Sequence, residues 1–298
     1  MVMSKKTNKP SKKTNWIAIV CFMIGIAMLA YPLAAQGYYR YLSSKKIVSF
    51  QKQAKKIPTA EVQKRLSLAR AYNDSLLTKT SLSDPYTVKQ KEGRLAYAKM
   101  LEVHEMIGTI KIPKINVNLA IYAGTSESVL QKGAGHLEGS SLPVGGKSTR
   151  AVITAHRGLP DARLFTDLNK MKVGDKFYIT NLSRTLAYQV DKIQVITPKN
   201  ISAVKIEKGR DLVTLLTCTP YMINTHRLLV TGHRIPYHPK EAKKEERNGQ
   251  MKAWLKLALI ILAFLALIAL FIWWTKHRRG KKGKGQANQD DVKENKEN

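Results

Sequence analysis

The sequence predicts a mainly β domain, most simply a closed β-barrel, held between two membrane-spanning helices. Two long runs near the ends of the 298-residue chain contain no charged residue, and a helical pattern follows the first of them. From residue 106 to residue 238 the chain then forms roughly seven or eight short β-type segments separated by turns, with few helices inserted. This order favours one closed or nearly closed barrel.

The two apolar runs cover residues 16–35 and 257–275. Each has the ~20 residues that a helix needs to cross a ~30 Å hydrocarbon layer. Neither has a polar face, which argues against a buried core helix. The Leu-Ala-Ala at residues 33–35 is also compatible with a signal-peptidase site. We expect an uncleaved anchor, because the run is longer than most signal-peptide cores, and we assign the spans to residues 16–37 and 254–275.

Basic residues outside the two spans predict the orientation of the chain. The tail at residues 1–15 carries five lysines and no acidic residue, and the tail at residues 276–298 begins with a basic cluster. Because cytoplasmic flanks carry the excess of Lys and Arg, both tails are predicted to be cytoplasmic and the segment between the spans to be extracellular. The second tail has the composition of a disordered segment.

The formal net charge of +30 raises the possibility of nucleic-acid binding. Part of this charge belongs to the tails, however, and the rest is spread over the outer segment without a compact basic motif. Attraction to an anionic cell wall or membrane is the better interpretation for an extracellular domain. We therefore predict no nucleic-acid partner, and we predict neither a metal site nor a cofactor.

Residues 38–105 are predicted to form a helical extension that ends in a turn. Val62, Leu66 and Ala69 recur at helical spacing among charged and polar residues. The triplet Asp84-Pro85-Tyr86 follows, and its proline forces the preceding residue out of helical geometry. Taken alone, this triplet is a surface turn within a loop at about residues 80–90.

The β domain is predicted at residues 106–238. We expect strands at residues 107–115, 117–123, 150–154, 176–181, 185–196, 211–217 and 226–233, with a brief helix at 126–133. A Ser-, Pro- and Gly-rich loop follows Gly135-His136-Leu137. Residues 239–253 read as a flexible, mixed-charge linker to the second span.

Cys218 is the residue around which the function of the chain is predicted. The other cysteine, Cys21, lies inside the first apolar run, where a small hydrophobic residue needs no further explanation. Cys218 is therefore alone in an exported domain, where cysteines usually form disulfides. An unpaired exported thiol indicates either an intermolecular bond or a reactive nucleophile.

A nucleophilic thiol needs a cationic neighbour that favours the thiolate. His156 and Arg227 are the best candidates, because each lies at the end of a predicted strand next to a loop. Cys218 would attack a carbonyl carbon, His156 would protonate the departing amine, and Arg227 would stabilise the oxyanion. The sequence shows no aspartate at an evident triad spacing. These residues indicate an extracellular, membrane-tethered cysteine acyl-transfer enzyme, with hydrolysis and transfer both open.

Three other histidines compete with His156 on composition alone, namely His136, His226 and His233.

The motifs around these residues resemble those of the sortases. Residues 214–218, Thr-Leu-Leu-Thr-Cys, are similar to the TLxTC motif, residues 154–158 are similar to the catalytic-histidine motif, and Arg227 follows the cysteine at the typical distance. The resemblance extends from about residue 107 to residue 237. It implies an eight-stranded sortase β-barrel that cleaves an LPxTG-like sorting signal between Thr and Gly. The threonine would be held as a thioester on Cys218 and passed to an amine.

The surroundings of the barrel are similar to class C, the pilin-polymerising sortases of Gram-positive bacteria. In that class an Asp-Pro-aromatic triplet forms a lid over the active site. Carried over, Asp84 would pair with Arg227, and Tyr86 would stack on the Cys218 sulfur where many members have Trp or Phe. Met222 stands where a glycine is frequent.

The predicted partners are then pilin subunits that supply the sorting signal and an acceptor lysine. Two alternatives stay open at this point. One is a housekeeping sortase that transfers surface proteins to a cell-wall precursor. The other is a non-catalytic, membrane-anchored barrel that binds wall polymers.

Overall fold

The computed structural model describes residues 12–77, 99–182 and 184–297. The predicted lid triplet, Asp84-Pro85-Tyr86, lies outside the described residues. The chain divides into two units, residues 1–246 and residues 247–298, and each is described by itself.

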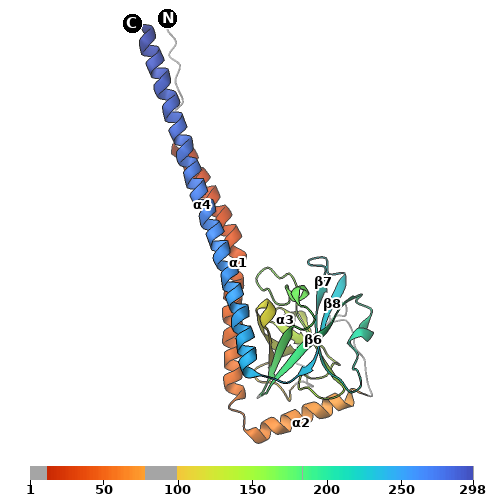
Figure 1. Ribbon diagram of the computed structural model, residues 1–298. Helices are drawn as coiled ribbons and strands as arrows, with labels where there is room; N and C mark the ends of the chain where they lie inside the picture. Colours follow the sequence, from red (N-terminus) through yellow and green to blue (C-terminus); the bar gives the residue numbers. More distant parts are fainter. Residues whose placement is uncertain (1–11, 78–98, 183, 298) are drawn as a thin grey trace. The chain divides into compact units, whose positions relative to one another are not determined.

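Eight strands of the first unit form a closed barrel, as the sequence predicts (Figure 1). The order around the barrel is β1-β2-β3-β4-β7-β8-β6-β5. The strands are β1 (Met106–Ile112), β2 (Val117–Ala123), β3 (Ala134–His136), β4 (Thr149–Thr154), β5 (Lys176–Asn181), β6 (Arg184–Ile196), β7 (Asp211–Thr219) and β8 (His226–Ile235). Two neighbouring pairs, β2–β3 and β4–β7, are parallel, and the other pairs are antiparallel.

Two details of the barrel differ from the prediction. Strand β3 has only three residues, too few to show an alternating pattern in the sequence. Strand β1 ends at Ile112, because a 3₁₀ turn, η2 (Pro113–Ile115), begins with a proline that has no N–H to donate to a neighbouring strand.

The two faces of the sheet carry separate apolar clusters. Val213 and Leu215 of β7 belong to the larger cluster inside the barrel. Leu216 belongs to a smaller cluster on the outer face, together with Val152 of β4, Leu229 of β8, Leu137 and Val204. Because side chains alternate between faces along a strand, Cys218, two positions beyond Leu216, lies on the outer face. The outer face at the end of β7 is therefore the place to look for the site.

The predicted helical extension is present as two helices. α1 (Lys12–Ala54) includes the first apolar run, and α2 (Thr59–Ser75) buries Val62, Leu66 and Ala69 as their spacing predicts. The Asn73 amide exchanges two hydrogen bonds with the backbone of Leu142, at 3.1 Å and 2.7 Å. These bonds attach α2 to the loop that follows β3.

The predicted linker and the predicted disordered tail are both wrong, because a single helix, α4 (Pro239–Glu297), covers them. Proline is well tolerated at a helix start. Within the first unit, Glu241 and Glu245 form ion pairs with Lys176 of β5, and Glu246 forms one with Lys111 of β1. These contacts attach the first turns of α4 to the barrel.

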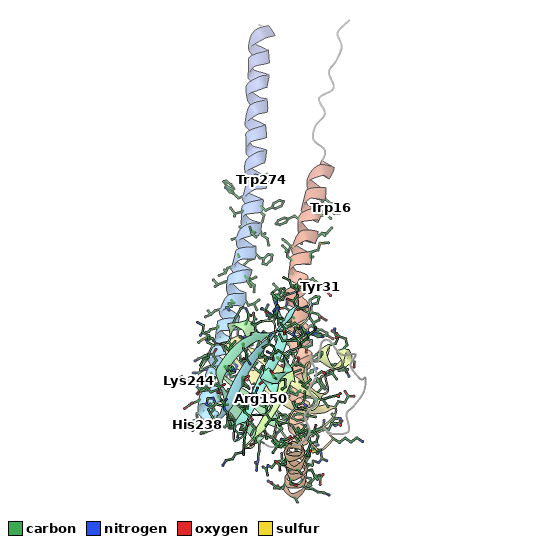
Figure 2. The ribbon with its side chains drawn as sticks, turned by 90° about the vertical axis from the view of Figure 1, so that its right-hand side faces the viewer. Trp16, Tyr31, Arg150, His238, Lys244 and Trp274 are labelled. Carbon is green, nitrogen blue, oxygen red and sulfur yellow. The ribbon has the colours of Figure 1, made fainter. Side chains whose placement is uncertain are left out.

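Within the part of the chain that the structure describes, two helices are long and apolar enough to cross a membrane. The segments are Val20–Ala54 of α1 and Pro239–Trp274 of α4. The most apolar 18-residue stretches within them have mean hydropathies of 1.7 and 3.0, and neither stretch is buried. Figure 2 shows Trp16 and Tyr31 projecting from α1 and Trp274 projecting from α4. Length and composition thus agree with the two predicted spans.

Candidate active site

Cys218 lies near the end of β7, directly opposite Arg227 at the start of β8. The two residues are Cα partners in the antiparallel ladder, so their side chains leave the same face of the sheet. Cys218 is 6% exposed and Arg227 is 4% exposed. The thiol is not part of a disulfide. The predicted juxtaposition of thiol and guanidinium is therefore present.

His156 follows β4, the parallel neighbour of β7 on its other side. The register pairs Thr154 with Leu216. Beyond the strand, the Ala155 N–H donates to the Leu216 carbonyl at 3.3 Å, and the Thr217 hydroxyl donates to the Ala155 carbonyl at 2.8 Å. These hydrogen bonds continue the pairing of the β4 and β7 segments as far as Ala155, the residue before His156. Continued by two residues, this register would place His156 opposite Cys218, on the outer face.

Arg227 is oriented by its own hairpin. One of its Nη atoms donates to the carbonyl of Asn224 at 2.9 Å and to that of His226 at 3.1 Å. The hairpin contains Met222 with a φ of +66°, in the left-handed region that favours glycine. This backbone conformation gives a physical reason for a frequent glycine at the position of Met222.

Glu127 is a site residue that sequence reasoning missed. It opens the short helix α3 (Glu127–Leu130), and both of its carboxylate oxygens lie 3.2 Å from Nε2 of His156. The His156 side chain is 18% exposed and that of Glu127 is 67% exposed. A four-residue helix far from the histidine in sequence gives no spacing signal, so only the fold reveals this pair.

Arg157 is the second residue that sequence reasoning missed. Its Nη1 donates to the Thr219 hydroxyl at 3.0 Å, and its Nε donates to the Thr166 carbonyl at 3.1 Å. The guanidinium also lies over the ring of Tyr221, 5.9 Å from its centroid. Arg157 therefore fastens the segment after Cys218 to the segment after His156.

The competing histidines occupy other positions. His136 is fully buried, with Nε2 2.8 Å from the Ser141 carbonyl, and burial lowers its pKa to about 4. His226 pairs with Thr219, one position beyond Cys218, and therefore faces the opposite side of the ladder. His233 pairs with Leu212 at the other end of β7.

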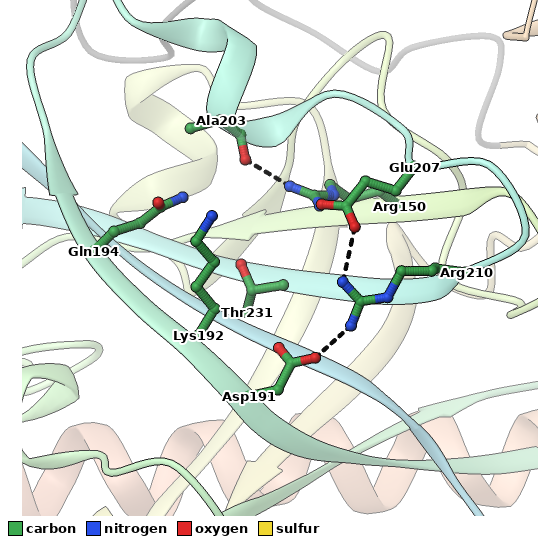
Figure 3. Close-up of a pocket in the computed structure, with 8 residues that line it drawn as sticks. All are labelled: Arg150, Asp191, Lys192, Gln194, Ala203, Glu207, Arg210 and Thr231. Carbon is green, nitrogen blue, oxygen red and sulfur yellow. Dashed lines mark hydrogen bonds and ion pairs between the residues drawn. The ribbon is translucent and has the colours of Figure 1, made fainter.

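A polar pocket lies on the same outer face, toward the opposite end of the strands (Figure 3). Buried Arg150 donates to the Ala203 carbonyl and to Glu207, and Arg210 joins Glu207 to Asp191. These ion pairs tie together β4, β6 and the segment before β7. Because its charged side chains largely pair with one another, we interpret the pocket as a structural feature that holds these segments together.

The comparisons with known proteins agree with this geometry. Residues 110–235 match the sortase domain family. Sortase C-1 from Streptococcus pneumoniae is 57% identical in a structural match that covers 65% of this chain and all of that chain, with a TM-score of 0.63. The chain belongs to the sortase family. It is accordingly a cysteine transpeptidase.

Two further relatives show the breadth of the sortase match. Sortase C2 of Group B Streptococcus Pilus Island 1 is 62% identical, with 60% of this chain and 100% of that chain covered and a TM-score of 0.57. The Sortase A of Listeria monocytogenes is 26% identical over 221 residues, which are 74% of this sortase and 90% of that protein. The chain is thus far more similar to the solved C-type enzymes than to this A-type enzyme.

Proposed function

We propose that this sortase belongs to class C and joins pilin subunits through isopeptide bonds. The observation that carries the proposal is its 53–62% identity to solved C-type sortases over nearly their whole length. One of those enzymes is described as pilus-related, and the structure of another is described as informative about pilin substrate specificity. The substrate is then a sorting signal of the LPxTG type.

In the first step, the Cys218 thiol passes its proton to His156, and the resulting thiolate attacks the carbonyl carbon of the threonine in the sorting signal. Arg227 stabilises the negative charge that forms on the carbonyl oxygen. The bond between threonine and glycine breaks, and His156 gives a proton to the departing glycine amine. The products are a threonyl thioester on Cys218 and a released peptide that begins with glycine.

In the second step, a lysine ε-amine of the next pilin attacks the thioester carbonyl. The amine gives up a proton to His156, the carbon–sulfur bond breaks, and an amide bond joins the two subunits. His156 thus receives in the second step the proton that it donated in the first. No cofactor enters either step.

We infer that the two spans anchor the enzyme with its barrel outside the cell, as the basic tails predict. We further infer that the segment with Asp84, Pro85 and Tyr86 covers the site in the resting enzyme. Asp84 paired with Arg227 is a charge-assisted contact, and Tyr86 on the sulfur would add ~0.3–1.5 kcal/mol.

The lid is tested by labelling the thiol. Asp84→Ala combined with Tyr86→Ala should increase the labelling rate of Cys218 by a small thiol reagent, by about three- to tenfold if those contacts are worth ~0.7–1.4 kcal/mol. Cys21 is removed in both proteins, so that only one thiol reacts. Equal labelling rates for the two proteins would contradict the lid.

The transferase is tested with the full-length enzyme in detergent. It is incubated with a sorting-signal peptide and either a pilin lysine donor or a cell-wall precursor. Mass spectrometry should detect a thioester on Cys218 and an amide product that forms faster with the lysine donor. Cys218→Ala should give neither species. A preference for the wall precursor would favour the housekeeping alternative, and function retained by Cys218→Ala would favour the wall-binding one.

A further inference from the structure

The contact between Glu127 and His156 restricts the state of the imidazole. A carboxylate accepts hydrogen bonds but does not donate them. Since both Glu127 oxygens lie 3.2 Å from Nε2, that nitrogen carries a hydrogen whenever the contact is formed. In the neutral ring, the bare nitrogen is then Nδ1.

Glu127 is itself held in place from two sides. The Gln131 side chain, one helical turn further on, donates to the same carboxylate at 2.5 Å. On the other side, Leu130 of α3 is fully buried, and α3 packs closely on β3. A Cβ at Gly135 of β3 would lie 2.4 Å from the Gly124 carbonyl oxygen and 3.0 Å from Leu130. Close packing of α3 on β3 therefore fixes the backbone that carries Glu127, and Gln131 fixes the carboxylate.

We propose that Glu127 is a positioning residue for His156, which holds the hydrogen of the neutral ring on Nε2 and so leaves Nδ1 to exchange protons with Cys218 and the reacting amines. The inference rests on the proposed roles of Cys218 and His156. Each half-reaction moves a proton on or off the ring. If the neutral ring keeps one tautomer, all of its molecules are in the form that can react.

The exposure of Glu127 indicates whether its negative charge or its hydrogen-bond acceptor has the larger effect on His156. Its side chain is 67% exposed, so water and salt screen its charge. Its oxygen, by contrast, acts by accepting the hydrogen bond from Nε2, which solvent does not screen. A glutamine keeps a carbonyl oxygen that accepts a hydrogen bond, whereas an alanine does not. Glu127→Gln should therefore retain most of the function that Glu127→Ala loses.

The test combines a spectroscopic readout with kinetics on the full-length enzyme in detergent. Selective ¹⁵N-histidine labelling reports the ring tautomer, and His156→Gln identifies the His156 signals. The wild type should show hydrogen on Nε2, Glu127→Gln should keep that pattern, and Glu127→Ala should show a mixture. The kcat for the sorting-signal peptide should fall on the order of tenfold in Glu127→Ala and less than about threefold in Glu127→Gln.

Glu105→Ala is the matched control, because this exposed carboxylate pairs with Lys132 just beyond α3 and does not contact His156. It should leave both the tautomer and kcat unchanged. Gln131→Ala should give a shift of the same kind as Glu127→Ala but smaller.

An unchanged tautomer in Glu127→Ala would overturn the inference, whatever happens to the rate. A rate loss that matches a lower melting temperature, without a tautomer change, would assign Glu127 a purely structural role. If instead the wild type forms no thioester, the proposed function fails, while the tautomer measurement still decides the role of Glu127.

Discussion

His136 ends strand β3 and His156 follows the neighbouring strand β4 of the same sheet, yet the two side chains have different surroundings. His136 pairs with Ile153 of β4 and therefore shares the side of the sheet that faces the barrel interior. His156 follows Val152 and Thr154 at alternating positions on the outer face, where Val152 joins the outer apolar cluster. The odd or even position along the strand thus places one histidine inside the barrel and the other on its outer face.

The partners of the two rings follow from this separation. His136 is surrounded by the turn after β3, with a backbone carbonyl at 2.8 Å and the Ser140 hydroxyl at 3.1 Å. His156 contacts a carboxylate from α3 and follows β4, the parallel neighbour of the strand that carries Cys218. Burial favours the neutral form of His136, whereas the His156 side chain is partly exposed, at 18%. The comparison teaches that burial and partners, not residue type, assign the chemistry.

The largest expected effect separates the two histidines by activity. His156→Ala should lower kcat/KM for the sorting-signal peptide by about 10²–10⁴-fold, the usual contribution of a general acid–base group. The melting temperature should change little, because the side chain is at the edge of the sheet. His136→Gln is the matched variant and should keep most of the activity per folded molecule. The opposite ranking of the two variants would contradict the comparison.

The next effect concerns stability as a function of pH. Burial depresses the pKa of His136 from 6.5 to about 4, so between these values the unfolded chain binds a proton that the folded chain does not. The free energy of unfolding therefore has its full value above pH 6.5 and falls by about 3 kcal/mol as the pH decreases toward 4. Urea unfolding followed by circular dichroism measures this slope.

The matched variant for this slope is again His136→Gln. It removes the titrating group, so the variant should lose less stability on acidification than the wild type does. Equal slopes for the two proteins would show that His136 is not the group responsible.

A smaller effect tests how the two regions are joined. Gly135→Ala should destabilise the fold by about 1–3 kcal/mol, because the added Cβ meets backbone and Leu130. It should also lower kcat, since α3 and with it Glu127 must move away from His156. Unfolding curves and steady-state rates check both expectations. A stability loss with an unchanged kcat would show that the two regions are independent.

Much of this arrangement is predictable from sequence because it depends on local patterns. The alternation in the segments that become β7 and β8 predicts where Cys218 and Arg227 face each other. Cys218, the one cysteine outside the apolar runs, predicts the chemistry, and the motif around His156 predicts its partner. The helical spacing of Val62, Leu66 and Ala69 predicts α2.

What sequence reasoning missed depends on tertiary contacts. Glu127 reaches His156 only because α3 packs on Gly135, and Arg157 reaches Thr219 only because β4 and β7 are parallel neighbours. The start of α4 looks like a linker by composition, but its glutamates pair with Lys111 and Lys176. Competing histidines were separable only by their strand positions. In each case the deciding neighbour is remote in the chain.

The most direct test of the account is the single-turnover formation of the thioester on Cys218, measured by intact-protein mass spectrometry. The full-length enzyme is mixed with excess sorting-signal peptide and no amine acceptor. The account predicts a threonyl adduct on Cys218 that forms at nearly wild-type rate in His136→Gln and far more slowly in His156→Ala. An adduct that forms equally fast in both variants, or on no cysteine at all, would contradict it.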